Sequence, residues 1–105
     1  MAAKRVTDPF LKAVIQAMIE RRKELGISQA KLSQICGLHR TFICEIERGM
    51  HVPTIRTLKT MIDGLQMPLS QLCEIAEKRV EAKKLKIVEP LVEQLDNAVL
   101  QSLQK

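Results

Sequence analysis

Residues that start and stop helices are so closely spaced in this sequence that only short helices fit between them. Helix N-caps, whose side-chain oxygen accepts a backbone N–H bond, are expected at Asp8, Ser28 and Thr54. The stops are glycines, which adopt the left-handed conformation without steric cost, at Gly26, Gly37 and Gly49. This spacing predicts helices over 9–25, 29–36, 39–48 and 55–65.

Apolar residues recur at helical spacing within each of these segments. The residues expected to point inward are Phe10, Val14, Met18, Leu25, Leu32, Ile35, Cys36, Ile43, Ile46, Ile55, Leu58, Met61, Ile62 and Leu65. Ile15 and Ile19 lie beside the first stripe, and Phe42 lies at the edge of the third. Strict alternation of apolar and polar residues, the pattern of a half-buried strand, is missing from the sequence. The sequence therefore predicts an all-α fold.

The last third of the chain predicts two further helices. The fifth is expected to open at Pro68 and Ser70 and to run toward Lys86, with an inward face of Leu69, Leu72, Cys73 and Ala76. Pro90 lacks a backbone N–H and disfavours helix at Glu89, so a break is expected there. The helix after it carries one apolar stripe, made of Leu91, Val92, Leu95, Val99 and Leu103.

Positive charge is concentrated in the first part of the chain. Up to residue 60 there are eleven Lys or Arg residues against five Asp or Glu, and beyond it six against seven. A basic segment joined to a near-neutral remainder favours a polyanionic partner. Many carboxylates also lie at helical spacing from a cation, such as Glu20 and Glu24 near Lys23.

Several functions lack support in the sequence. We expect no enzyme, no metal site and no cofactor, because there is no phosphate-binding loop, nucleophile elbow or Cys-His cluster. The three cysteines, Cys36, Cys44 and Cys73, are interpreted as small buried hydrophobic residues in a reducing cytoplasm. No apolar run has the length of a membrane span, and no signal peptide is expected.

Two of the predicted helices form a helix-turn-helix between Ser28 and Arg48. Gly37-Leu38-His39 makes the tight turn between them, with Leu38 filling the corner. If Ile43 and Ile46 face inward, the outer face of the second helix carries Arg40, Thr41, Cys44, Glu45 and Arg48. This short, polar and partly basic face fits the major groove of double-stranded DNA.

The sequence resembles the Cro/C1 repressor family over about residues 10–76. The resemblance rests on RRKELGISQAKLS at 21–33, LHRTFI at 38–43, IERG at 46–49 and PTIRTL at 53–58. The Arg-Thr-Phe-Ile run is similar to that of restriction-modification controller proteins. The resemblance implies a five-helix, lambda-repressor-like DNA-binding domain.

The resemblance also implies roles for individual residues. Ser28 and Gln29 would bond phosphates, and Gln29 would brace the recognition helix. Arg40, Thr41 and Glu45 would read base edges, with Arg40 forming two hydrogen bonds to guanine. Phosphate contact is favoured over simple solvation for the remaining cations, Arg48, Arg56 and Lys59.

Some positions stay open. His39 is either an N-cap or a phosphate donor, and Phe42 is either a core residue or a contact to a thymine methyl group. For Arg22 and Glu47, the resemblance to the family implies an internal ion pair. Gln66 and Pro68 depart from the family pattern, where glycine and a capping serine are usual, which leaves the turn after the fourth helix open.

We interpret residues 1–76 as the DNA-binding domain and residues 77–105 as a helical extension. The extension either folds back or, as we favour, pairs two chains, because a small domain has little spare surface to cover its stripe. A homodimer would read a pseudo-palindromic operator. The expected function is a transcriptional regulator, most simply a repressor. The alternatives are an antitoxin and a protein-interaction module that has lost DNA binding.

Overall fold

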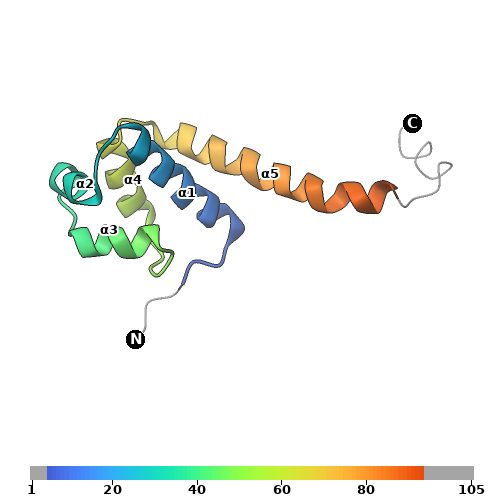
Figure 1. Ribbon diagram of the computed structural model, residues 1–105, viewed down its shortest axis with the longest axis horizontal. Helices are drawn as coiled ribbons and strands as arrows, with labels where there is room; N and C mark the ends of the chain where they lie inside the picture. Colours follow the sequence, from blue (N-terminus) through green and yellow to red (C-terminus); the bar gives the residue numbers. More distant parts are fainter. Residues whose placement is uncertain (1–4, 94–105) are drawn as a thin grey trace.

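Residues 5–93 contain five helices and no strand, which confirms the all-α prediction. The computed structural model describes the backbone of residues 5–93 and the side chains of residues 5–85. The helices are α1 (Pro9–Glu24), α2 (Gln29–Cys36), α3 (Arg40–Glu47), α4 (Ile55–Gly64) and α5 (Leu69–Glu93). Figure 1 shows α1–α4 gathered into one bundle, while α5 starts beside this bundle and extends past it.

The predicted helix starts and stops are confirmed. Each N-cap side chain accepts a bond from the amide three residues on, at 2.8 Å for Asp8, 3.0 Å for Ser28 and 3.1 Å for Thr54. Such a cap typically stabilises a helix by about 1 kcal/mol. The stop glycines have positive φ, at +69° for Gly26, +74° for Gly37 and +73° for Gly49.

The hydrophobic core joins all five helices. Its largest fully buried side chains are Met18, Leu32, Ile43, Ile46, Met61, Ile62, Leu65 and Leu72. Burial of one such side chain contributes about 1.5–3 kcal/mol. Gly64 lets α4 approach α2 closely, because a Cβ there would lie 3.2 Å from Ile35 Cγ2 and 3.4 Å from Leu32 Cδ1.

Several residues expected to point inward are exposed. The exposed fraction is 66% for Ile55 and 47% for Ile35, and Phe10 and Leu25 are also exposed. Each lies at the edge of an apolar stripe, where the neighbouring helices leave much of its surface uncovered. The three cysteines are half-buried, not buried as predicted, because they lie at stripe edges too.

The predicted break at Pro90 is wrong, because α5 continues to Glu93 without interruption. Proline removes one hydrogen bond and crowds the carbonyl four residues earlier, yet these costs do not end α5 at Pro90, since three more helical residues follow it. The predicted dimerisation stripe, Leu91, Val92, Leu95, Val99 and Leu103, lies outside the described side chains.

The turn between α4 and α5 keeps a backbone suited to glycine, although glycine is missing. Gln66 has φ of +57° and is the one non-glycine residue with positive φ in the described part of the chain. Its side chain is exposed. The conformation costs an L-residue roughly 1–2 kcal/mol.

Replacing Gln66 with glycine is expected to raise the free energy of unfolding by about 0.5–1 kcal/mol. The gain is smaller than the relieved strain, because glycine also increases the conformational freedom of the unfolded chain. Urea unfolding measures the change. The control Gln66→Ala keeps the Cβ and should leave stability unchanged; an equal gain in that variant would assign the effect to the side chain instead.

An ion pair between α1 and α5 was not expected from the sequence. Arg79 Nη1 lies 2.5 Å from Glu20 Oε2, and Nη2 lies 3.0 Å from Oε1. This hydrogen bonding to Arg79 holds the pKa of Glu20 below its ordinary value, against the opposing effect of burial. The interpretation that Glu20 pairs with a cation on its own helix is therefore wrong, because two guanidinium nitrogens of Arg79 on α5 bind its carboxylate.

The Glu20–Arg79 pair should make part of the stability depend on pH. A carboxyl group with a lowered folded-state pKa stabilises the fold above its ordinary pKa of about 4.3 and loses that contribution as pH falls. At pH 7, Glu20→Gln is expected to cost less than about 1 kcal/mol, because the pair is partly exposed and screened. As pH falls below about 4.3, the difference in urea midpoint between the variant and wild type should shrink. A constant difference across pH would contradict this assignment.

Candidate nucleic-acid interface

The turn between α2 and α3 is fixed by local hydrogen bonds. The Gly37 amide donates to Ser33 O at 2.9 Å, and Ser33 Oγ donates to Leu38 O. The Thr41 amide donates to His39 Nδ1 at 3.1 Å, so His39 is the N-cap of α3. These bonds set the orientation of α3 relative to α2, as in a helix-turn-helix.

The inner face of α3 is anchored in the core. Ile43 and Ile46 are fully buried, and Leu32 of α2 is 1% exposed. Phe42 is half-buried and packs against the core, with its ring 4.9 Å from that of His51 in an edge-to-face arrangement. Phe42 therefore has the contacts of a core-edge residue and leaves only part of its ring to solvent.

The outer face of α3 is open to solvent. Arg40, Thr41, Glu45 and Arg48 are all exposed, as the sequence predicts. A shallow concavity of about 250 Å³ is lined by Arg40, Thr41 and Cys44 of α3 and by Gln29 of α2. Cys44 was not among the predicted site residues, although its position one turn after Arg40 places it on the same face.

The electrostatics of this face suit an anion. None of α2, α3 and α4 has an acidic residue in its first turn, so their positive dipole ends are not neutralised. Arg40, Arg48 and Arg56 make no ion pair with any described residue, whereas Lys59 Nζ lies 2.6 Å from Asp63 Oδ1. The side chains of that pair are more than half exposed, so Lys59 can leave Asp63 at little cost.

The predicted ion pair between α1 and α3 is confirmed. Arg22 Nη2 lies 2.9 Å from Glu47 Oε1, and Arg22 Nε donates to both carboxylate oxygens. Arg22 Nη1 also donates to Ile27 O at 2.9 Å. Gln29 Nε2 lies 3.3 Å from Glu47 Oε2, so the start of α2 is tied to the end of α3. The bracing expected of Gln29 therefore has a geometric basis.

Neither a metal centre nor a membrane-spanning helix is found in the described part of the chain. Among the described residues, no three His, Cys, Asp or Glu side chains are placed to hold a metal ion. Within residues 5–93, none of the helices has an apolar stretch of the length a bilayer requires. The shallow concavity is lined by Gln29, Arg40, Thr41 and Cys44, and the exposed Ser28 directly precedes Gln29.

Two curated proteins are similar in sequence to this chain. An uncharacterised HTH-type transcriptional regulator of Haemophilus influenzae is 36% identical over 58 residues, which cover 55% of this chain and 59% of that protein. The ImmF control region 10 kDa protein of Bacillus phage phi105 is 28% identical over 53 residues, covering 50% and 59%. This chain thus matches about three-fifths of the length of each relative.

Solved structures with this fold include a restriction-modification controller protein. Wild-type C.Esp1396I superposes with a TM-score of 0.67 at 28% identity, covering 72% of this chain and 99% of that one. A single-residue variant of it gives 0.66 at 29% identity, covering 71% and 95%. The helix-turn-helix family model matches residues 18–72, which is more than half of the chain. The chain therefore belongs to the helix-turn-helix family, and its domain is of the Cro/C1 type.

Proposed function

We propose that this chain is a sequence-specific DNA-binding regulator of transcription that reads the major groove with α3. The observation that carries the proposal is the outer face of α3, which is solvent-exposed and polar. It lies beside the N-terminus of α2, whose first turn has no acidic residue. A major groove about 12 Å wide admits one such helix. The similar proteins named as a transcriptional regulator and a control region protein support this function.

The proposed contacts divide into base reading and positioning. Arg40, Thr41 and Glu45 face the bases, and Cys44 lines the concavity with Arg40 and Thr41. Phosphate contacts, which fix register without specifying sequence, are assigned to Ser28, Gln29, His39, Arg48, Arg56 and Lys59. Phe42 contributes its exposed edge to the groove, while the rest of its ring supports the core.

We further propose that two copies bind one operator. One recognition helix covers only a few base pairs, whereas a two-fold dimer reads half-sites about one helical turn apart. Among the α5 residues whose side chains the structure describes, Ala76 is the last buried one, and no residue from 77 to 85 is buried. This change in burial supports the division into a DNA-binding domain at 1–76 and a pairing extension at 77–105. A dimer placed over a promoter would repress by excluding polymerase.

Selection of bound duplexes from a random DNA pool tests the proposal. Enrichment of an inverted repeat with half-site centres about 34 Å apart would support a dimeric, sequence-specific regulator. Enrichment of a single half-site would support DNA reading by one copy and contradict the dimer. Recovery of unordered sequences would contradict specific readout. Light scattering on the free protein at micromolar concentration gives the oligomeric state independently.

A further inference from the structure

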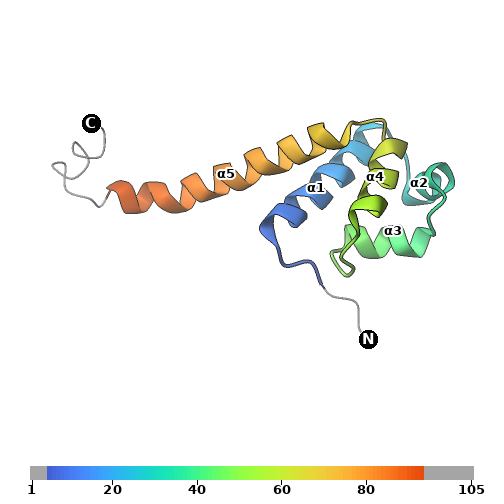
Figure 2. The ribbon, with the colours of Figure 1, turned by 180° about the vertical axis from the view of Figure 1, so that it is seen from behind.

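The N-terminal segment before α1 is fixed against the end of α3. The Val6 amide donates to Gly49 O at 2.9 Å, and the Val6 side chain is only 7% exposed. Figures 1 and 2 show that the segment preceding α1 runs along the same edge of the molecule as α3. Arg5, next to the bonded Val6, is therefore held close to the exit of the recognition helix.

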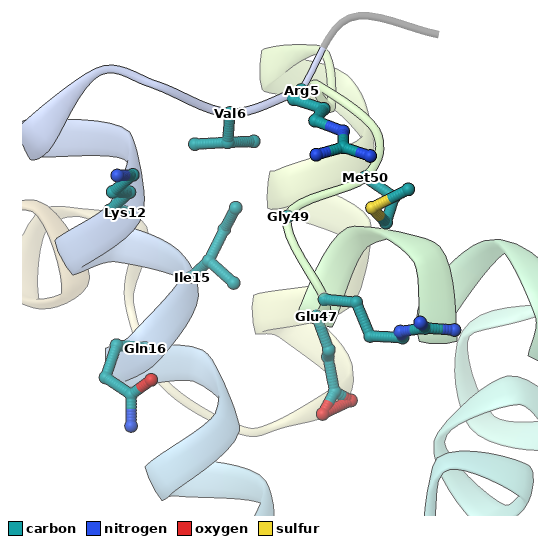
Figure 3. A pocket seen from close by; sticks show the side chains of 9 residues that line it. Arg5, Val6, Lys12, Ile15, Gln16, Glu47, Gly49 and Met50 are labelled. Carbon is teal, nitrogen blue, oxygen red and sulfur yellow. The ribbon is translucent and has the colours of Figure 1, made fainter.

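A pocket of about 400 Å³ lies between this segment, α1 and the end of α3 (Figure 3). We call it the N-terminal pocket. Its apolar wall is formed by Val6 and Ile15, and its cations are Arg5, Lys12 and Arg48. The three cations come from three separate segments of the chain, and all three are exposed.

The N-terminal pocket carries net positive charge. Glu47 is the one acid that lines it, and this carboxylate already accepts hydrogen bonds from Arg22 and Gln29. Arg5, Lys12 and Arg48 make no ion pair with any residue that the structure describes. Gln16 adds an exposed amide to the wall. The pocket therefore offers several unengaged donors from different sides.

We propose that the N-terminal pocket binds one phosphate of the DNA backbone, next to the bases that α3 reads. Arg48 belongs both to this pocket and to the outer face of α3, so the two surfaces are continuous. Arg5 and Lys12 thereby extend the DNA interface beyond the helix-turn-helix. The inference rests on the proposed DNA binding and adds residues that lie outside the motif.

The test measures DNA affinity against salt concentration for Arg5→Gln, Lys12→Gln and the double variant of the full chain. A protein loses affinity with salt in proportion to the phosphates that it neutralises, with a slope of about 0.9 per phosphate on logarithmic axes. The double variant should lower the slope by about one, so that between 50 and 200 mM salt it loses roughly threefold less affinity than wild type. Lys83→Gln, an exposed α5 lysine without an ion pair among the described residues, is the matched control and should keep the wild-type slope.

Ethylation of single phosphates identifies the contact. In wild type, ethylation of one particular phosphate should weaken binding, and the double variant should not respond to ethylation at that phosphate. A wild-type slope in the double variant, or the same loss in Lys83→Gln, would overturn the inference while DNA binding stands. If wild type binds no duplex at low salt, the proposed function fails and this inference falls with it. Because both changed side chains are exposed, thermal unfolding should show unaltered stability.

Discussion

Replacing Glu47 with alanine is expected to lower the free energy of unfolding by about 3 kcal/mol, a large part of the 5–15 kcal/mol typical of a small domain. The side chains of Arg22 and Glu47 are only 13% and 7% exposed. Removing the carboxylate leaves a largely buried guanidinium without its charged partner. Arg22 keeps its bond to Ile27 O, which places the loss at the low end of the range for a broken buried pair.

Two further variants separate this explanation from a general sensitivity to charge removal. Asp63→Ala breaks an ion pair whose side chains are more than half exposed, so its expected cost is below about 1 kcal/mol. The double variant Arg22→Met/Glu47→Leu removes both charges and should recover most of the stability that Glu47→Ala loses. If Glu47→Ala and Asp63→Ala cost the same in urea unfolding, the pair does not anchor α3 to α1.

The features predicted correctly from the sequence are local ones. An N-cap depends on one side chain and an amide three residues away, so Asp8, Ser28 and Thr54 could be assigned from their neighbours alone. The outer face of α3 followed from the helical period once Ile43 and Ile46 were placed inward. For the same reason, Arg40 and Thr41 were correctly predicted to be exposed.

The features that sequence reasoning missed depend on distant parts of the chain. Ile55 has the period of an inward residue, but whether a neighbouring helix covers it is a property of tertiary packing. Glu20 meets Arg79 across 59 residues, and Val6 bonds Gly49 across the whole helix-turn-helix. No spacing rule connects such pairs. The Arg22–Glu47 pair, 25 residues apart, was predicted only because the sequence resembles a known family.

Replacing Arg40 with alanine is expected to weaken binding to the selected operator by about 1–3 kcal/mol and to relax the preference at one base pair. Arg40 is the first residue of α3 and lines the concavity with Gln29 and Thr41. A cation in the first turn opposes the helix dipole, so it does not stabilise the helix there. The free energy of unfolding of the variant should therefore be no lower than that of wild type. The loss of affinity is then an effect on DNA recognition and not on folding.

Arg56→Ala provides the comparison for Arg40→Ala, because both remove an exposed arginine without an ion pair to any described residue. A phosphate contact at Arg56 would weaken binding to every sequence alike and reduce the salt slope by about one. A base contact at Arg40 would weaken binding to the operator much more than binding to unrelated duplexes, because phosphates are common to all sequences while base edges are not. Fluorescence anisotropy on both kinds of duplex measures this difference. An equal loss on operator and unrelated DNA would place Arg40 on a phosphate and would assign sequence reading to Thr41, Cys44 and Glu45.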